Sequence, residues 1–280
     1  MKKSIRPRIG GAVYILPNLL TSGNLYFGYF SIVKSMQGDF GWAAGAILLA
    51  AIFDILDGRV ARLTNGTSEF GVQYDSLCDL ISFGLAPAIM MYQYTLHGLG
   101  RIGWIFCFIF LACGALRLAR FNVQSSIGKA EGDFTGLPIP MAAGVVACFV
   151  GFMADVDDAE GKQLWIMRQI YNFFSSEEVR QSFFLIMAPL LAFLMVSNVA
   201  YRSHKSFKIK GIKPFRFLAL LVVSFGLVAY KPPLFGFLFF FIYAMSGIFE
   251  WVVGWKQPTD DDEIFQPQDE DTFMEPKSRD

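Results

Sequence analysis

The sequence predicts an all-α fold, a polytopic membrane helical bundle of about eight transmembrane helices. Apolar residues make up 54% of the 280 residues, charged residues only 17%, and the mean hydropathy is +0.43. Those values are typical of a chain that crosses a bilayer several times, and they exclude an ordinary soluble domain. The formal net charge of zero carries no information about partners, because the charged residues are concentrated in a few short segments.

Eight windows are long and apolar enough to cross a hydrocarbon core, which requires about 20 residues each. They lie at 14–33, 41–62, 73–94, 102–120, 138–154, 182–201, 215–231 and 234–254. The sequence therefore divides into three parts: a basic N-terminal segment (1–13), a transmembrane domain (14–254) and an acidic tail (255–280) whose composition is typical of disorder.

The positions of the basic residues predict the orientation in the membrane. The N-terminal segment contains Lys2, Lys3, Arg6 and Arg8, and the 202–214 loop contains five more basic residues, from Arg202 to Lys213. Loops rich in Lys and Arg remain in the cytoplasm. With eight spans, both termini are then cytoplasmic, and we expect a multi-pass protein of a bacterial inner membrane. In the 155–181 loop, on the opposite side, "LWIMRQIYNFF" predicts a short amphipathic helix in the membrane interface.

The four cysteines fall in apolar stretches without a CxxC pair. This pattern predicts neither a zinc site nor a disulfide framework, and a buried apolar role is the better interpretation.

Four carboxylates stand out in the stretch "FDILDGRVARLTNGTSEFGVQYDSLCDL". Asp54 and Asp57 are three residues apart and share a face of the second helix, and Asp75 and Asp79 are four apart on the third. A turn at Asn65-Gly66 lets the two helices pack antiparallel, which brings both pairs together at the cytoplasmic ends of the second and third helices.

Such a cluster requires compensating charge, because a single carboxylate at the centre of a membrane helix costs about 2.5–3.5 kcal/mol. Divalent cations with oxygen ligands remove the repulsion, and Mg²⁺ or Mn²⁺ suits an all-carboxylate site that also accepts phosphate. We therefore predict two ions held by Asp54, Asp57, Asp75 and Asp79. The small residues Gly58, Ala61 and Gly71 clear space beside them, and Arg62 adds a guanidinium that matches phosphate geometry.

The same residues resemble the signature of the CDP-alcohol phosphotransferase family, D-x2-D-G-x2-A-R-x8-G-x3-D-x3-D, at every specified position. The stretch "PNLLTSGN", Pro17 to Asn24, is also similar to this family. The resemblance implies a transferase in which an alcohol displaces CMP from a CDP-linked lipid, with Asp79 as the general base. It also implies contacts to the CDP-lipid, here CDP-diacylglycerol, from Gly58, Ala61, Arg62, Ser68, Gly71, Asn18 and Thr21.

Three further stretches resemble the phosphatidylserine synthase branch of that family: "RLARFNV", "FTGLPIPMAAG" and "LMVSNVAYRSHK". This resemblance implies L-serine as the acceptor, phosphatidylserine as the product and a role in phospholipid biosynthesis. Arg117, Arg120 and Asn122 then become candidates for serine binding, since arginine suits bidentate binding of a carboxylate. Taken from the residues alone, Arg117 and Arg120 are better interpreted as anchors at the membrane surface.

Two alternatives remain open at this point. A relative with another acceptor, such as glycerol 3-phosphate or inositol phosphate, would keep the chemistry and change the substrate. An ion or solute transporter would instead place acids near the middle of several spans. The family resemblance also suggests a homodimer in contact with membrane lipid, and we expect no nucleic-acid partner.

Overall fold

The computed structural model describes residues 12–64, 68–126, 134–158, 165–201, 226 and 230–252. These residues form an almost entirely helical bundle, so the predicted all-α class is confirmed. The principal helices are α1 (Ala12–Met36), α2 (Phe40–Thr64), α3 (Glu69–Asp79), α4 (Ala86–Tyr94), α5 (Arg101–Ser126), α6 (Ile139–Asp158), α7 (Trp165–Phe174), α8 (Glu177–Val196) and α10 (Pro232–Val252).

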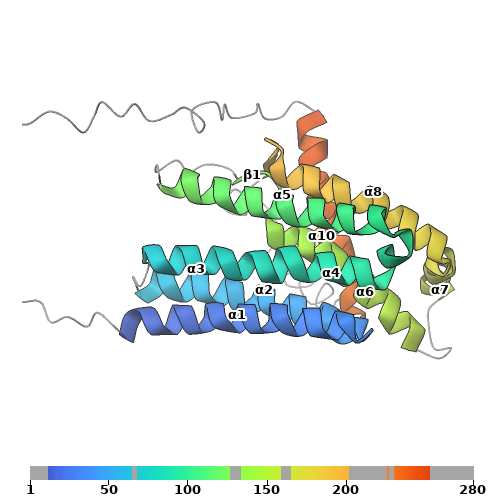
Figure 1. The fold of residues 1–280 in the computed structure, drawn as a ribbon, viewed down its shortest axis with the longest axis horizontal. Coiled ribbons are helices and arrows are strands. Elements are labelled where there is room, and N and C mark those ends of the chain that lie inside the picture. Colours follow the sequence, from blue (N-terminus) through green and yellow to red (C-terminus); the bar gives the residue numbers. More distant parts are fainter. Residues whose placement is uncertain are drawn as a thin grey trace, which may run out of the picture.

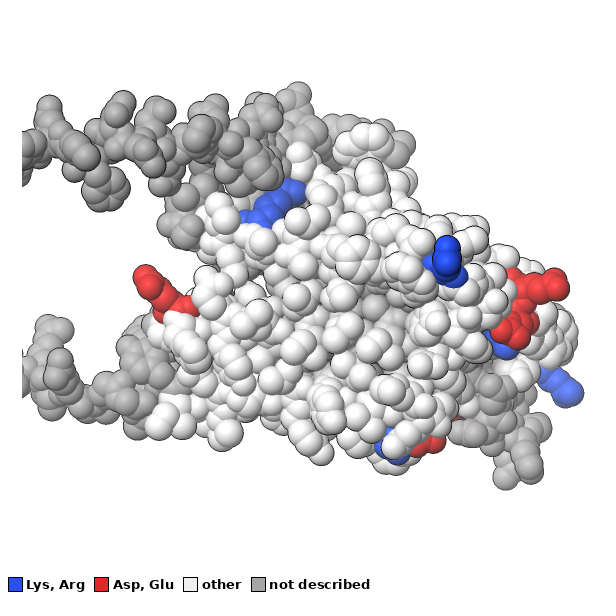
Figure 2. All heavy atoms as spheres, viewed as in Figure 1, with Lys and Arg blue, Asp and Glu red and all other residues white. Residues whose placement is uncertain are grey.

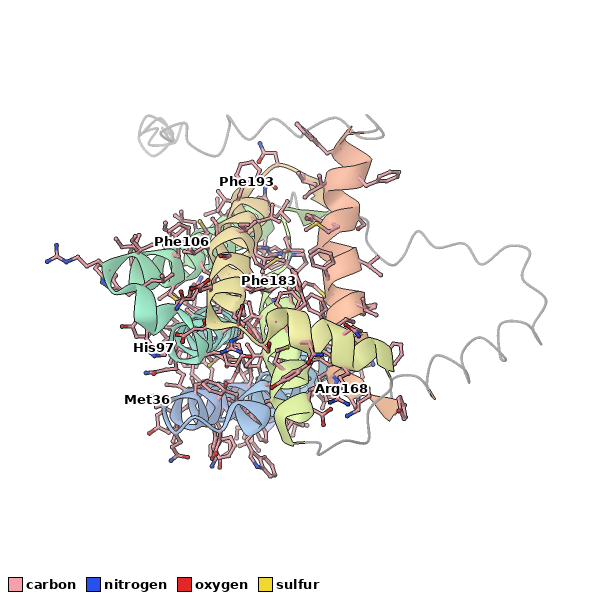
Figure 3. The ribbon with its side chains drawn as sticks, turned by 90° about the vertical axis from the view of Figure 1, so that its right-hand side faces the viewer. Met36, His97, Phe106, Arg168, Phe183 and Phe193 are labelled. Carbon is pink, nitrogen blue, oxygen red and sulfur yellow. The ribbon has the colours of Figure 1, made fainter. Side chains whose placement is uncertain are left out.

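The long helices form two groups that run side by side (Figure 1). Helices α1 and α2 lie beside the α3–α4 segment, and α5 pairs with α8 above them. Helix α6 packs between the groups, against α2 and α10, while α10 stands across the long axis of the bundle (Figures 1 and 3). The core is built largely from small side chains of α2 and α6, including Ala43, Ala50, Ala142 and Ala147. Small residues at such faces allow helices in a membrane to approach closely.

The third predicted span is a helix with a π-helical turn in its middle. Residues Leu80–Leu85 form this turn between α3 and α4, beginning directly after Asp79. The π-turn presses Ser82 against α1, where a Cβ added at Gly28 would lie only 2.2 Å from the Ser82 Oγ. Single π-turns in α-helices occur frequently at functional sites, and this one lies next to the predicted site.

Five of the described helices are long and apolar enough to cross a membrane: α2, α5, α6, α8 and α10. Figure 2 shows that Lys, Arg, Asp and Glu lie toward the two ends of the visible face and leave a band without charge between them. Large apolar side chains such as Trp42, Ile52 and Phe108 are exposed on the outside. The protein is therefore a multi-pass membrane protein.

The remaining predicted spans have different outcomes. Helix α1 covers the first, and the α3–α4 segment covers the third, both alongside α2 (Figure 1). Most of the predicted span 215–231 lies outside the described residues, as do residues 1–11, the 202–214 loop, the Asn65-Gly66 turn and the acidic tail.

The predicted helix in the 155–181 loop is present as α7. It lies across one end of the bundle, the end that faces the viewer in Figure 3, where Arg168 is labelled. Ile170, Tyr171 and Phe174 pack on the core while Arg168 is exposed, which is the amphipathic pattern expected of an interfacial helix.

Two short elements complete the fold. Strands β1 (Phe134–Thr135) and β2 (Ala200–Tyr201) pair antiparallel and connect the segments that follow α5 and α8. None of the four cysteines forms a disulfide, and Cys78, Cys107 and Cys148 are buried, so the predicted apolar role is confirmed.

Candidate active site

The end of α2 and the start of α3 place three of the predicted aspartates together. Each of Asp54, Asp57 and Asp75 offers a carboxylate oxygen, and these oxygens all lie within 4.8 Å of one another. Asp79 is outside this set. It lies one turn further along α3, and only 8% of its surface is exposed.

Helix α1 donates a hydrogen bond to one aspartate from each pair. The Thr21 hydroxyl lies 2.7 Å from Asp57 Oδ2, and it also approaches the Pro17 carbonyl oxygen at 3.1 Å. The Asn24 amide Nδ2 donates to Asp79 Oδ1 at 2.9 Å. Thr21 and Asn24 are three residues apart and therefore share the face of α1 that meets α2 and α3.

The other two aspartates, Asp54 and Asp75, lack protein partners. Among the described residues, no side chain donates a hydrogen bond to either carboxylate and no lysine or arginine forms an ion pair with them. The Oδ1 atom of Asp75 is buried without a hydrogen-bond partner. Buried carboxylates are normally paired or bound to metal, so this donor set fits a hard divalent cation.

A cavity of about 190 Å³ opens beside the carboxylates. Its lining contains Asp57 and Asp75 together with all seven residues predicted to contact the CDP-lipid: Asn18, Thr21, Gly58, Ala61, Arg62, Ser68 and Gly71. Pro17 and Val72 complete it. The tertiary fold thus brings together side chains from three helices that the sequence spreads over more than fifty positions.

The small and capping residues shape this cavity in distinct ways. A Cβ added at Gly58 would meet nothing within 4 Å, so the absent side chain leaves open space in the cavity. The Ser68 Oγ accepts a hydrogen bond from the Gly71 backbone N–H at 3.0 Å and caps the start of α3. The Arg62 Nε donates to the Gly58 carbonyl at 2.9 Å, and its side chain is otherwise exposed at the mouth.

The three residues proposed for serine binding do not form one cluster. Arg120 donates to the Val196 carbonyl and to Asn198 Oδ1, at 3.2 and 2.8 Å, and so holds the end of α8. Asn122 donates to Ser76 Oγ at 2.9 Å, on α3. Arg117 differs from both. It is buried, its Nε has no hydrogen-bond partner, and its charge interacts with Asp79.

The site also includes a contact that the sequence patterns did not assign. Asn24 was noted only as the end of the "PNLLTSGN" stretch, yet it donates directly to Asp79. The available signal was its spacing from Thr21, since two polar residues on one face of an apolar helix indicate a functional face.

The comparisons with known proteins agree with this geometry. The family model described as CDP-alcohol phosphatidyltransferase matches residues 14–175, which is more than half of the chain and includes α1 to α6. The chain belongs to the CDP-alcohol phosphatidyltransferase family. All four aspartates and all the residues that line the cavity lie within the matched range.

Three relatives within this phosphatidyltransferase family are informative. A protein of Helicobacter pylori named CDP-diacylglycerol–serine O-phosphatidyltransferase is 35% identical over 240 residues, covering 86% of this chain and 92% of the relative. A protein of the same name from Methanocaldococcus jannaschii is 35% identical over 208 residues, covering 74% and 83%. The archaetidylserine synthase of Methanothermobacter thermautotrophicus is 43% identical over 148 residues, covering 51% and 62%.

Proposed function

We propose that the protein is a membrane-embedded CDP-diacylglycerol–serine O-phosphatidyltransferase. It moves the phosphatidyl group from CDP-diacylglycerol to the hydroxyl of L-serine and produces phosphatidylserine and CMP, a step of phospholipid biosynthesis. Family membership, and relatives with serine-directed names that cover most of the chain, support this function. The observation that carries it is the carboxylate cluster beside a cavity lined by the seven predicted donor-substrate residues.

The cavity is proposed to hold the CDP part of the donor lipid. Gly58, Ala61 and Gly71 let a flat or bulky group approach the helix backbones, while Arg62 supplies a guanidinium for a phosphate. Asn18, Thr21 and Ser68 add polar atoms along the wall. The diacylglycerol chains then extend into the surrounding bilayer, where apolar side chains cover the outside of the helices.

The carboxylate cluster is proposed to hold two divalent ions, Mg²⁺ or Mn²⁺, with Asp54, Asp57, Asp75 and Asp79 as ligands. When bound, such ions neutralise the diphosphate and stabilise the CMP leaving group. The absence of cationic partners for Asp54 and Asp75 among the described residues supports this assignment.

Asp79 is proposed to act as the general base. It accepts the hydroxyl proton of serine as the serine Oγ attacks the phosphorus on the lipid side of the diphosphate. The bond from that phosphorus to the bridging oxygen breaks, and this oxygen leaves with CMP. Burial of Asp79 excludes bulk water, which favours transfer to serine over hydrolysis.

Arg117 is the strongest of the three candidates for the serine carboxylate. It is a buried cation whose Nε lacks a hydrogen-bond partner, and its charge interacts with that of Asp79. A carboxylate is the natural bidentate partner for such a group. Arg120 and Asn122 instead donate hydrogen bonds to other side chains of the protein, which favours a structural role for them.

The alternatives are less well supported. A phosphorylated acceptor should require several cations, whereas Arg62 is the one cation among the described residues that line the cavity. A transporter should carry acids in the middle of several spans, whereas these four lie on only two helices, α2 and α3, which follow each other in the chain. We further propose that the protein lies in a bacterial inner membrane, with both termini and the site on the cytoplasmic side, and that it forms a homodimer.

The decisive experiment measures CMP release from CDP-diacylglycerol by the purified protein in detergent with Mg²⁺ or Mn²⁺. L-serine, glycerol 3-phosphate and inositol phosphate are compared as acceptors. Serine-dependent release is expected. Release with only one of the phosphorylated alcohols would change the acceptor, and no release with any alcohol from folded, metal-supplemented protein would contradict the proposed function.

Asp79→Asn tests the base in the same assay. We expect turnover to fall by at least about 100-fold, since a positioned base contributes on the order of 10²–10⁴ to the rate. The amide is isosteric, so the melting temperature should stay close to that of the unaltered protein. Activity near the original level would contradict the assignment of Asp79.

A further inference from the structure

Helix α1 contributes buried polar side chains that the proposed chemistry does not yet use. Among the buried polar residues of α1, Thr21 and Asn24 both contact an aspartate. Thr21 contacts a carboxylate of the three-membered cluster, and Asn24 contacts Asp79, which lies outside it. The two donors therefore serve different carboxylates.

Asn24 is held rigidly against Asp79. Its side chain is fully buried, at 0% exposure, and its backbone carbonyl accepts a hydrogen bond from the Ser82 Oγ at 3.0 Å. Ser82 belongs to the π-turn that follows Asp79, so Asn24 contacts α3 and the π-turn together. The close approach at Gly28, where any Cβ would clash with Ser82, fixes the spacing of these helices.

The chemistry of an amide suits this position. An amide Nδ2 is a neutral donor that cannot lose its proton, so it orients a carboxylate without adding a formal charge beside it. A lysine or arginine there would instead hold the base in its ionised form and weaken it as a proton acceptor. The opposite amide orientation would place two oxygens against each other, so the ionised carboxylate itself selects the orientation that the structure has.

We propose that Asn24 is the positioning residue of the general base. By donating to Asp79 Oδ1, it directs the second oxygen, Oδ2, toward the serine hydroxyl. This inference rests on the proposed function, since it assigns a role relative to the base named there. Asn24 itself does not contact the reacting atoms and is not a catalytic residue.

The test substitutes Asn24 by leucine, which has a similar branched shape and no donor but is larger, and by alanine, which avoids a steric clash if leucine prevents folding. We expect turnover to fall by about 10- to 100-fold, as is typical when a group that orients a reacting or ligating residue is removed. The KM values for CDP-diacylglycerol and serine should change by less than about threefold, because neither substrate loses a ligand.

Tyr74→Phe is the matched control. The Tyr74 hydroxyl lies 2.9 Å from the Ser22 Oγ, so this change removes a hydrogen bond between the same two helices that involves no carboxylate. Turnover in the control should stay within about twofold of the original, because only a structural contact is lost.

A double substitution separates positioning from stability. If Asn24 acts through Asp79, Asn24→Leu should cause no further loss of turnover in an Asp79→Asn background, whereas a purely structural role would add its full effect. Additive losses, or unaltered turnover in both Asn24 variants, would each overturn the inference. The proposed function is judged separately, by serine-dependent CMP release from the unaltered protein.

Discussion

The acidic residues at the two ends of the bundle differ in whether they form ion pairs with lysine or arginine. At the end described in Figure 3, Lys34 pairs with Asp39 at 2.6 Å, and Lys231 pairs with Asp155. At the other end, Asp54, Asp57 and Asp75 lie close together with Asp79 one helical turn away, and no described lysine or arginine forms an ion pair with any of them. Acids that serve the fold are neutralised by the chain itself. Acids without such partners among the described residues are the ones that we propose bind a metal ion.

The largest difference between the two ends, in CMP release and in melting temperature, is expected when an aspartate without an ion-pair partner is replaced. Asp75→Asn should lower CMP release by at least about tenfold, because it removes a proposed metal ligand. The same change should raise the melting temperature of the metal-free protein by about 2–4 °C, because it relieves repulsion among clustered carboxylates. A shift of this size corresponds to about 1 kcal/mol in the free energy of unfolding. Activity assays and thermal unfolding in EDTA measure the two effects.

Asp39→Asn is the control at the opposite end. It should leave CMP release unaltered and should not raise the melting temperature, since it removes an attractive contact to Lys34 instead of a repulsive one. If Asp75→Asn lowered the stability of the metal-free protein as a paired acid would, the comparison between the two ends would fail.

A smaller contrast is expected between two glycines of α2. A Cβ at Gly58 or at Gly45 would meet nothing within 4 Å, so alanine fits both positions. Each Gly→Ala change should stabilise the helix by about 0.5–1 kcal/mol. Only Gly58→Ala should lower kcat/KM for CDP-diacylglycerol, by about tenfold, because its methyl group would enter the cavity.

Steady-state kinetics and thermal unfolding of both variants check this prediction. Equal kinetics for Gly58→Ala and Gly45→Ala would show that the cavity does not bind the donor lipid. A loss of stability in either variant would contradict the open space around both positions.

The smallest effect on stability is expected at the end of the bundle where the acidic residues form ion pairs. Asp155→Asn breaks a half-exposed ion pair between α6 and the start of α10, whose side chains are 42% exposed for Asp155 and 17% for Lys231. Pairs of this kind contribute about 0.2–1 kcal/mol. The free energy of unfolding should fall by that amount, and CMP release should remain unchanged. A marked loss of activity would show that this end also takes part in catalysis.

Much of the site could be predicted from spacing alone. The i, i+3 and i, i+4 spacings placed each pair of aspartates on one helix face, and the short connection between α2 and α3 allowed the pairs to meet. The seven residues that the family resemblance implies as contacts to the CDP-lipid line one cavity. These features depend on local geometry, which a helical period transmits directly from the sequence.

The serine candidates were harder to interpret for a physical reason. Arg117, Arg120 and Asn122 lie within two turns of α5, and their spacing spreads them over different faces of the helix. Arg117 faces the interior, whereas Arg120 reaches α8 and Asn122 reaches α3. Which neighbour each side chain meets is set by the rotation of α5 against those helices, which no local pattern specifies.

The sequence by itself determined the membrane character, the helical class, the four aspartates and the small residues beside them. Hydropathy and helical periodicity are properties of short stretches of chain, so they can be evaluated without knowing the fold. Only the tertiary structure decided that Asp79 lies apart from the other three, that Asn24 donates to it and that a π-turn follows it. Those features arise from contacts between residues more than fifty positions apart, where the packing of α1 against α3 selects the hydrogen bonds.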